Sequence, residues 1–269
     1  MFGRDASNRA RRRRAAKAEL VRLFHAPQSV LAIHYSCESF YDRPDGSSPR
    51  ITSIAVRNLG SGQTVSFSIH QLAERDKKIK DEEIESSYDD LEKKMLKEFY
   101  DYVERNRHCI WLHWNMRDVN YGFAALAHRF KVLGGKEPSE IPESQLCDLA
   151  RLLVGLYGVG YIGHPRLARI IEKNKISDKD FLTGEDEAKA FRNKQYVKLH
   201  QSTLRKVDIL TNLAERVHDG TLRTNATRSE IYGSELAYLV QLCQEHWFFA
   251  IIAFVGSVAS VIGLIVAFM

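Results

Sequence analysis

Four polar residues draw attention because they lie beside predicted strands or on a predicted helix, where side chains can be held for chemistry. They are Glu38, Asn115, Asp118 and Asp208. Carboxylate oxygens are hard ligands that suit magnesium or manganese. Each residue also has an ordinary structural interpretation. Glu38 and Asp208 would be solvated surface groups, and Asn115 with Asp118 would cap the helix that follows them.

The segments that would position these residues alternate between strand and helix patterns. Apolar or alternating runs predict strands at 29–35, 51–58, 64–70 and 108–113, with a hairpin turn at 59–63. Helical patterns follow at 8–25, 91–102, 120–133, 145–156, 165–173, 185–216 and 229–244, and the charged segment 74–90 is expected to loop outward. This order predicts an α/β fold in which an antiparallel hairpin joins a mixed sheet with flanking helices.

In this order of elements and motifs, roughly residues 29 to 217 resemble the DEDD exonucleases, typified by polymerase proofreading subunits. The resemblance implies a ribonuclease-H-like fold. It also implies that Glu38, Asp118 and Asp208 hold one or two Mg²⁺ or Mn²⁺ ions, which would activate water and steady the leaving 3′ oxygen. Asn115 would contact the substrate, and His200 is the candidate for a displaced catalytic histidine.

Two positions depart from that family's pattern. Ser36 stands where the first aspartate belongs, and that aspartate normally bridges both metals. Thr203 stands where the catalytic histidine is usual, so that His200 lies close to one further helical turn upstream. Asp148 and Glu92 could replace the missing carboxylate if the fold brought them close to the others.

The segment 248–269 carries no charged residue. At 1.5 Å per residue, a helix of this length crosses a bilayer core of about 30 Å. A buried soluble helix would normally show a polar stripe, and this segment has none. The sequence therefore predicts a single C-terminal transmembrane helix that resembles a tail anchor, with the soluble part facing the cytoplasm. Gly256 with Ser260, and Ala259 with Gly263, have the spacing that lets such helices associate into homo-oligomers.

Positive charge is concentrated near the N-terminus. Residues 1–22 hold eight Arg or Lys and two acidic residues, whereas the whole chain has an excess of only five positive charges. This predicts a basic arm whose partner is a polyanion, either nucleic acid or anionic lipid, with a solvated terminus as the alternative. The arginines assigned to nucleic-acid contact are Arg11, Arg12, Arg13 and Arg14.

Four parts are therefore expected: the basic arm 1–28, a ribonuclease-H-like domain 29–220, a juxtamembrane helix 221–247 and the span 248–269. The four cysteines lie far apart, which disfavours a zinc site or a disulfide framework. The leading functional hypothesis is a membrane-tethered, metal-dependent 3′–5′ exonuclease acting on DNA or RNA. The alternative is a catalytically inactive exonuclease-like head that senses nucleic acid or a nucleotide. Such a head would control an oligomerising membrane span, as in a bacterial defence effector.

Overall fold

The computed structural model describes residues 2–38, 48–75, 83–117, 120–227 and 230–231. These residues form two compact units. The larger, called the sheet unit, comprises Glu19–Leu152 and Gly163–Thr224. The smaller, called the terminal unit, takes in the described residues up to Ala18, Leu153–Ile162 and those from Asn225 onward. The units cut across the predicted boundary at residue 28, because the first helix contributes to both.

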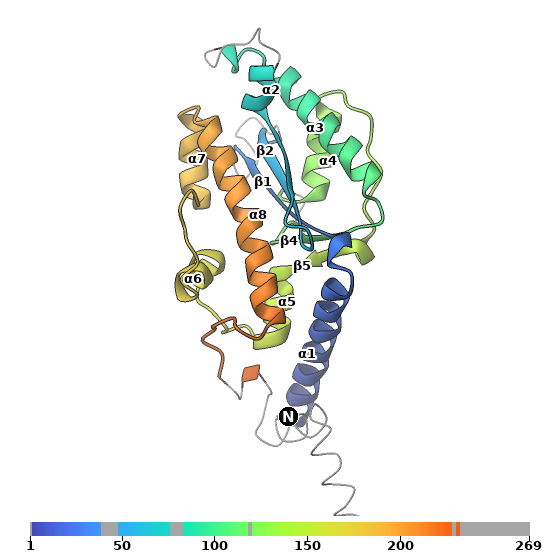
Figure 1. The fold of residues 1–269 in the computed structure, drawn as a ribbon, viewed down its shortest axis with the longest axis vertical. Helices are drawn as coiled ribbons and strands as arrows, with labels where there is room; N and C mark the ends of the chain where they lie inside the picture. The colour runs from blue at the N-terminus through green and yellow to red at the C-terminus, as the bar shows by residue number, and fades with distance from the viewer. Residues whose placement is uncertain (1, 39–47, 76–82, 118–119, 228–229, 232–269) are drawn as a thin grey trace, which may run out of the picture. The chain divides into compact units, whose positions relative to one another are not determined.

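The sheet unit is built on a mixed five-stranded sheet (Figure 1). Its strands are β1 (Val30–Cys37), β2 (Ile51–Asn58), β3 (Thr64–Ser68), β4 (Ile110–His113) and β5 (Leu146–Asp148), in the order β3-β2-β1-β4-β5. β1, β4 and β5 run parallel, whereas β1 with β2 and β2 with β3 pair antiparallel. The predicted α/β class, with an antiparallel hairpin on a mixed sheet, is confirmed.

Helices of the sheet unit flank this sheet. The helices of the two units together are α1 (Phe2–His25), α2 (Ile69–Arg75), α3 (Tyr88–Arg105), α4 (Phe123–Val132), α5 (Leu149–Tyr157), α6 (Arg166–Lys173), α7 (Gly184–Arg192) and α8 (Tyr196–His218). Short 3₁₀ turns precede β1 (Pro27–Ser29) and β5 (Glu143–Gln145). Within the sheet unit, α8 runs along β1 and β2 on one face, and α3 and α4 cover the other (Figure 1).

Alternation of side chains along β1 explains the two layers. Leu31, Ile33 and Tyr35 join the apolar core with residues of α3 and α4. The intervening positions point to the other face. There Ser36 contacts α8 directly. Bulky side chains therefore fill the α3 side, while the α8 side of the same strand carries small or polar residues.

Several predicted boundaries differ from the structure. β3 ends at Ser68 and α2 begins at Ile69, and β5 precedes α5 where one helix was expected. The predicted helix 185–216 is two helices, interrupted where Lys194 has a φ of 56°. Left-handed residues do not continue a right-handed helix. Within 83–90, Ile84 and Tyr88 are buried, so this part packs inward instead of looping outward.

In the terminal unit, the first part of α1 packs on the end of α5. A Cβ built at Gly155 would lie 2.8 Å from the Cβ of Ala16, so only glycine permits this approach. Among the described residues, none of the helices has both the length and the apolar character needed to cross a membrane. The predicted span 248–269 lies outside the described residues, as does 232–244 of the predicted preceding helix.

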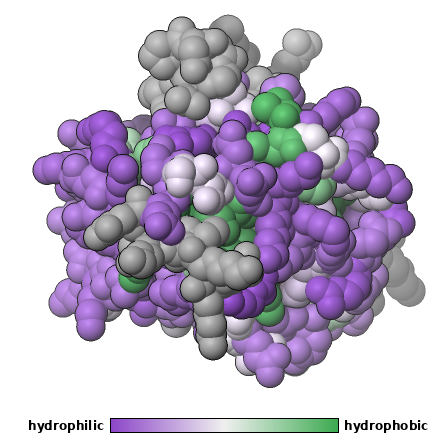
Figure 2. All heavy atoms as spheres, turned by 90° about the horizontal axis from the view of Figure 1, so that it is seen from above, coloured by the Kyte–Doolittle hydropathy of each residue, from purple (hydrophilic) through white to green (hydrophobic). Residues whose placement is uncertain are grey.

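The face of the molecule seen in Figure 2 is largely hydrophilic, and its hydrophobic residues form small areas. The exposed large apolar side chains among the described residues are valines in different segments: Val21, Val65, Val132, Val159 and Val197. Apolar side chains exposed singly are ordinary on a protein surface and mark no docking face.

Candidate functional site

Glu38 lies just after β1, and its carboxylate faces Arg50. The backbone N–H of Arg50 lies 3.4 Å from Glu38 Oε2, and its side-chain Nε lies 3.5 Å from the same oxygen. The Arg50 guanidinium also pairs with Glu85 at 2.7 Å and lies 4.6 Å from the Tyr88 ring centroid and 4.9 Å from that of Phe191. Glu38 thus belongs to a cluster of side chains that surrounds Arg50 at the start of β2.

Asp208 lies elsewhere in the sheet unit. It pairs with Arg205 one turn away on α8, and its carboxylate lies 3.8 Å from Arg57 near the end of β2. Arg50 and Arg57 stand at opposite ends of that strand, about 23 Å apart at the usual rise per residue. Glu38 and Asp208 therefore do not converge on one metal. The third predicted ligand, Asp118, lies outside the described residues.

Asn115 follows β4 in a left-handed conformation, with a φ of 57°. Its backbone N–H lies 3.3 Å from Asp148 Oδ1, and the same oxygen accepts from the N–H of Ala150 at 2.9 Å. Arg117 pairs with the other oxygen of Asp148. Asp148 thus joins the turn after β4 to the start of α5. This contact is made by the backbone of Asn115, and the predicted contact of its exposed side chain with a substrate stays a prediction.

Glu92 is equally occupied. It is fully buried and accepts from the N–H of Ile51 at 2.7 Å and from Arg129 at 2.9 and 2.6 Å. Arg129 stays paired with it in the layer between α3 and α4. Since both oxygens of Glu92 already accept hydrogen bonds, from Arg129 of α4 and from Ile51 of β2, Glu92 does not replace the missing aspartate, and Asp148 is likewise engaged.

His200, the predicted catalytic histidine, is 5% exposed and packs against His70 of α2, with 4.9 Å between the ring centroids. Burial, with a smaller effect of His70, lowers the pKa of His200 to about 4. Its Nε2 has no hydrogen-bond partner among the described residues. At neutral pH His200 is therefore an uncharged, packed side chain whose ring contacts another histidine.

Ser36 occupies the position at which the resemblance places the first aspartate, and it joins a set of buried hydroxyls. Ser36 Oγ lies 2.8 Å from Thr203 Oγ1 of α8, which lies 2.7 Å from Ser53 Oγ of β2. Thr203 also donates to the carbonyl of Leu199 at 2.9 Å. All three hydroxyl side chains are at most 1% exposed. These small side chains let α8 pack directly on β1 and β2.

A buried ion pair adjoins these hydroxyls. Ser36 Oγ donates to Glu187 Oε1 of α7 at 2.8 Å, and Lys206 Nζ of α8 lies 2.8 Å from the same oxygen. The side chains of Lys206 and Glu187 are 5% and 2% exposed. Charges this deep persist only when paired and hydrogen-bonded. The polar network is the name used below for Ser36, Ser53, Glu187, Thr203 and Lys206.

The polar network does not fit a Mg²⁺ or Mn²⁺ site. Those ions favour carboxylate and other oxygen ligands. Here Glu187 is the one carboxylate, and the Lys206 ammonium already neutralises it. Within the part of the chain that the structure describes, no group of three His, Cys, Asp or Glu residues could hold a metal ion. The described residues thus do not form the predicted metal site.

Sequence reasoning missed Glu187, Lys206 and Ser53. One signal was present for Lys206. Leu199, Thr203, Lys206 and Leu210 recur at helical spacing, and all four are buried. A charged residue on an otherwise inward stripe of a long helix indicates a buried partner, although the stripe cannot identify that partner.

The basic arm is the helix α1, and its arginines differ. Arg11, Arg12 and Arg14 are exposed, whereas Arg13 is 8% exposed. Within the terminal unit, Arg9 donates to the carbonyl of Glu230 at 2.7 Å and to that of Val154 at 3.1 Å. The exposed arginines are thus available to a polyanion, while Arg13 is packed and is unsuited to that role.

Comparison with known proteins found no family model that matches the chain. No curated protein matches its sequence. The likeness to the DEDD exonucleases therefore rests on the residues and the order of elements described above.

Proposed function

We propose that the sheet unit is an exonuclease-like head that binds nucleic acid or a nucleotide without hydrolysing it. The observation that carries this proposal is the polar network. Where a metal-bridging carboxylate would be needed, a serine hydroxyl is buried against Thr203, and the nearby carboxylate of Glu187 is held by Lys206. The Lys206 ammonium and the Glu187 carboxylate neutralise each other in this buried place, which leaves no set of ligands for a metal that would activate water.

The ribonuclease-H-like identity of the fold is part of this proposal. The central strand β1 pairs with the antiparallel hairpin strand β2 on one side and with the parallel strand β4 on the other. The long last helix α8 packs on β1 and β2. The order of strand, hairpin, helix, strand and helices is the order that the resemblance implies, and it supports the assignment.

The proposed head acts on a membrane span. The uncharged segment 248–269 would anchor the chain, and its small residues would mediate self-association. The exposed arginines of α1 would then contact anionic lipid beside the anchor or the backbone of a bound nucleic acid. In this scheme ligand binding by the head changes the association of the spans, as in a defence effector that acts on membranes.

The test uses the full chain purified in detergent. Binding of a labelled single-stranded oligonucleotide and of ATP is measured in EDTA, and cleavage of 3′-labelled DNA and RNA is measured with Mn²⁺. We expect binding in EDTA and no trimming. The control is Asp118→Ala, which should behave as the wild type. Manganese-dependent trimming that Asp118→Ala abolishes would restore the nuclease hypothesis.

A further inference from the structure

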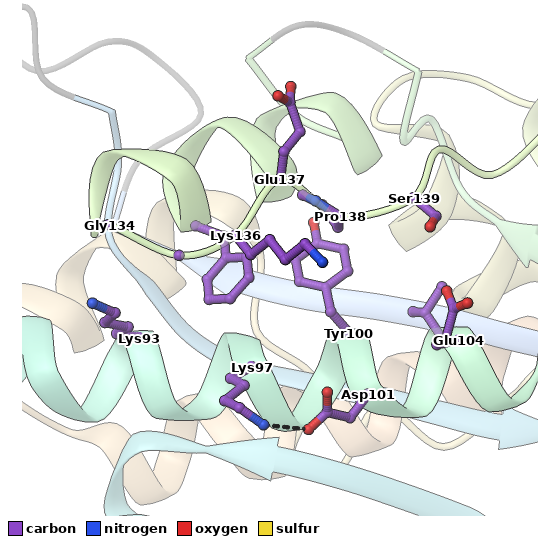
Figure 3. A pocket seen from close by; sticks show the side chains of 13 residues that line it. Lys93, Lys97, Tyr100, Asp101, Glu104, Gly134, Lys136, Glu137, Pro138 and Ser139 are labelled. Atoms are coloured by element: carbon purple, nitrogen blue, oxygen red, sulfur yellow. Dashed lines mark hydrogen bonds and ion pairs between the residues drawn. The ribbon is translucent and has the colours of Figure 1, made fainter.

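A groove of about 550 Å³ lies in the sheet unit between α3 and the loop that follows α4 (Figure 3). Lys93, Lys97 and Tyr100 line it from α3, and Phe130 and Lys136 line it from α4 and the loop. This volume is within the range of small-molecule sites. The groove is separate from the polar network, which lies under α8 on the other face of the sheet.

Two glycines shape the wall that carries Lys136. Gly134 has a φ of 73°, a conformation that other residues adopt only at a cost. A Cβ at Gly135 would collide with the Phe130 ring, so that ring and backbone are in direct contact there. From the opposite wall, Lys93 Nζ comes within 3.3 Å of the position of a Cβ on Gly134. The turn therefore brings the ammonium of α3 close to the loop that carries Lys136.

The acidic side chains that line the groove are paired with cations, whereas two of its lysines are not paired with anions in the part of the chain that the structure describes. Each acidic side chain has a cation: Asp101 pairs with Lys97 at 2.7 Å, Glu104 with Arg107 at 3.1 Å, and Glu137 with Lys131 at 3.3 Å. Lys93 and Lys136, in contrast, make no hydrogen bond or ion pair with the described residues. Two ammonium groups thus face the groove without an anion from the described residues.

The groove also has an aromatic floor. Tyr100 stacks on Phe130, with 5.3 Å between ring centroids and 28° between ring planes. In Figure 3 the Lys136 side chain extends toward the ring of Tyr100. Aromatic side chains of this kind accept planar rings by stacking, and a flexible lysine stem can move aside to admit one.

A second groove of about 540 Å³ lies across the segment Glu137–Ser139 and shares Tyr100 with the first. Its Arg117 and Lys131 are already paired with Asp148 and Glu137. It therefore lacks the unpaired lysine ammonium groups that distinguish the first groove.

We propose that the groove between α3 and the Gly134–Ser139 loop binds a nucleotide, with Lys93 and Lys136 on its phosphates and the base against Tyr100. Lysine ammonium groups are compact charges that recognise phosphate. The assignment rests on the proposed function for its ligand class and locates that ligand on the α3 face of the sheet.

The experiment measures binding of ATP, inorganic triphosphate and adenosine to the full chain in detergent and EDTA by calorimetry. The variant Lys93→Gln/Lys136→Gln removes both unpaired ammonium groups. The matched control Lys173→Gln/Lys198→Gln removes two exposed lysines from α6 and α8, with the same change in net charge. We expect the groove variant to bind ATP at least tenfold more weakly and the control to change less than twofold. Wild-type protein should bind ATP more tightly than triphosphate or adenosine.

Equal ATP affinity in both variants would overturn the groove assignment while leaving a nucleotide-binding head. Triphosphate binding as tight as that of ATP would overturn the role of Tyr100 and the nucleotide class. Binding of the oligonucleotide without binding of ATP would overturn the groove assignment alone. If the protein bound neither the oligonucleotide nor ATP, the proposed function would be overturned as well. Hydrolysis of ATP that depends on Lys93 and Lys136 would keep the groove and overturn the non-hydrolytic head.

Discussion

At the scale of single residues, the buried pair of Lys206 and Glu187 shows why one side chain cannot be changed alone. Lys206→Met would leave the Glu187 carboxylate buried without its cation. We expect the free energy of unfolding in urea to fall by about 3–5 kcal/mol. The double variant Lys206→Met/Glu187→Gln removes both charges and should recover most of that loss. Lys198→Met, at an exposed position of α8, is the control and should change stability by less than about 0.5 kcal/mol. A loss below about 1 kcal/mol for Lys206→Met would contradict the buried pair.

The second residue-scale prediction concerns His200. Its pKa is about 4 in the folded protein, mainly because burial opposes protonation. An unfolded histidine has a pKa of about 6.5. Its contribution to stability is therefore complete above pH 6.5 and is lost as pH falls toward 4. At pH 5 the loss is about 2 kcal/mol for this one group.

His200→Gln tests this by removing the group that titrates. Urea unfolding of both proteins at pH 7 and pH 5 should show that the wild type loses about 2 kcal/mol more than the variant over this interval. His34 and His113, whose pKa values are also lowered by burial, remain in both proteins. The difference therefore isolates His200, and parallel losses in the two proteins would contradict its buried neutral state.

At the scale of elements, the sequence predicted those segments whose own periodicity decides their structure. The strand 51–58 was predicted with its observed ends, because its alternation is bounded by a polar turn. The break between α7 and α8 contains no Gly or Pro that would have predicted it, because Lys194 itself adopts the left-handed conformation. The polar network could not be predicted, because Ser36 and Thr203 are 167 residues apart and meet only once α8 lies on β1. The local sequence pattern thus predicts helices and strands, whereas tertiary packing decides which of their side chains contact one another.

The packing of α1 on α5 gives a prediction at the element scale. Gly155→Val would place a branched side chain where the Ala16 Cβ already lies, since a built Cβ comes within 2.8 Å of it. Overpacking of this kind costs about 1–3 kcal/mol, which should open the contact and speed trypsin cleavage after the exposed arginines of α1 about five- to a hundredfold. Gly163→Val is the matched control, because a Cβ there meets nothing within 4 Å. Equal cleavage rates in the two variants would show that Gly155 does not set this contact.

At the scale of the whole molecule, the proposals assign three tasks to three parts of one chain. The sheet unit would bind the ligand, the exposed arginines of α1 would bind a polyanion, and the segment 248–269 would anchor the chain in the membrane. The groove and the polar network lie on opposite faces of the sheet, so a ligand can be bound at Lys93 and Lys136 while the buried pair of Lys206 and Glu187 stays intact.

The predicted anchor can be tested in the full chain by placing a charge at its centre. Val258 stands midway along 248–269. An arginine at the centre of a membrane helix raises the free energy of insertion by roughly 2.5–3.5 kcal/mol, whereas leucine favours insertion. Val258→Arg should therefore shift the protein from the carbonate-resistant membrane pellet to the soluble fraction, and Val258→Leu should remain in the pellet. If the wild type is itself released by carbonate, the segment is not an anchor. The head would then have to act through soluble association, because the hydrophobic segment would need another copy of itself to cover it.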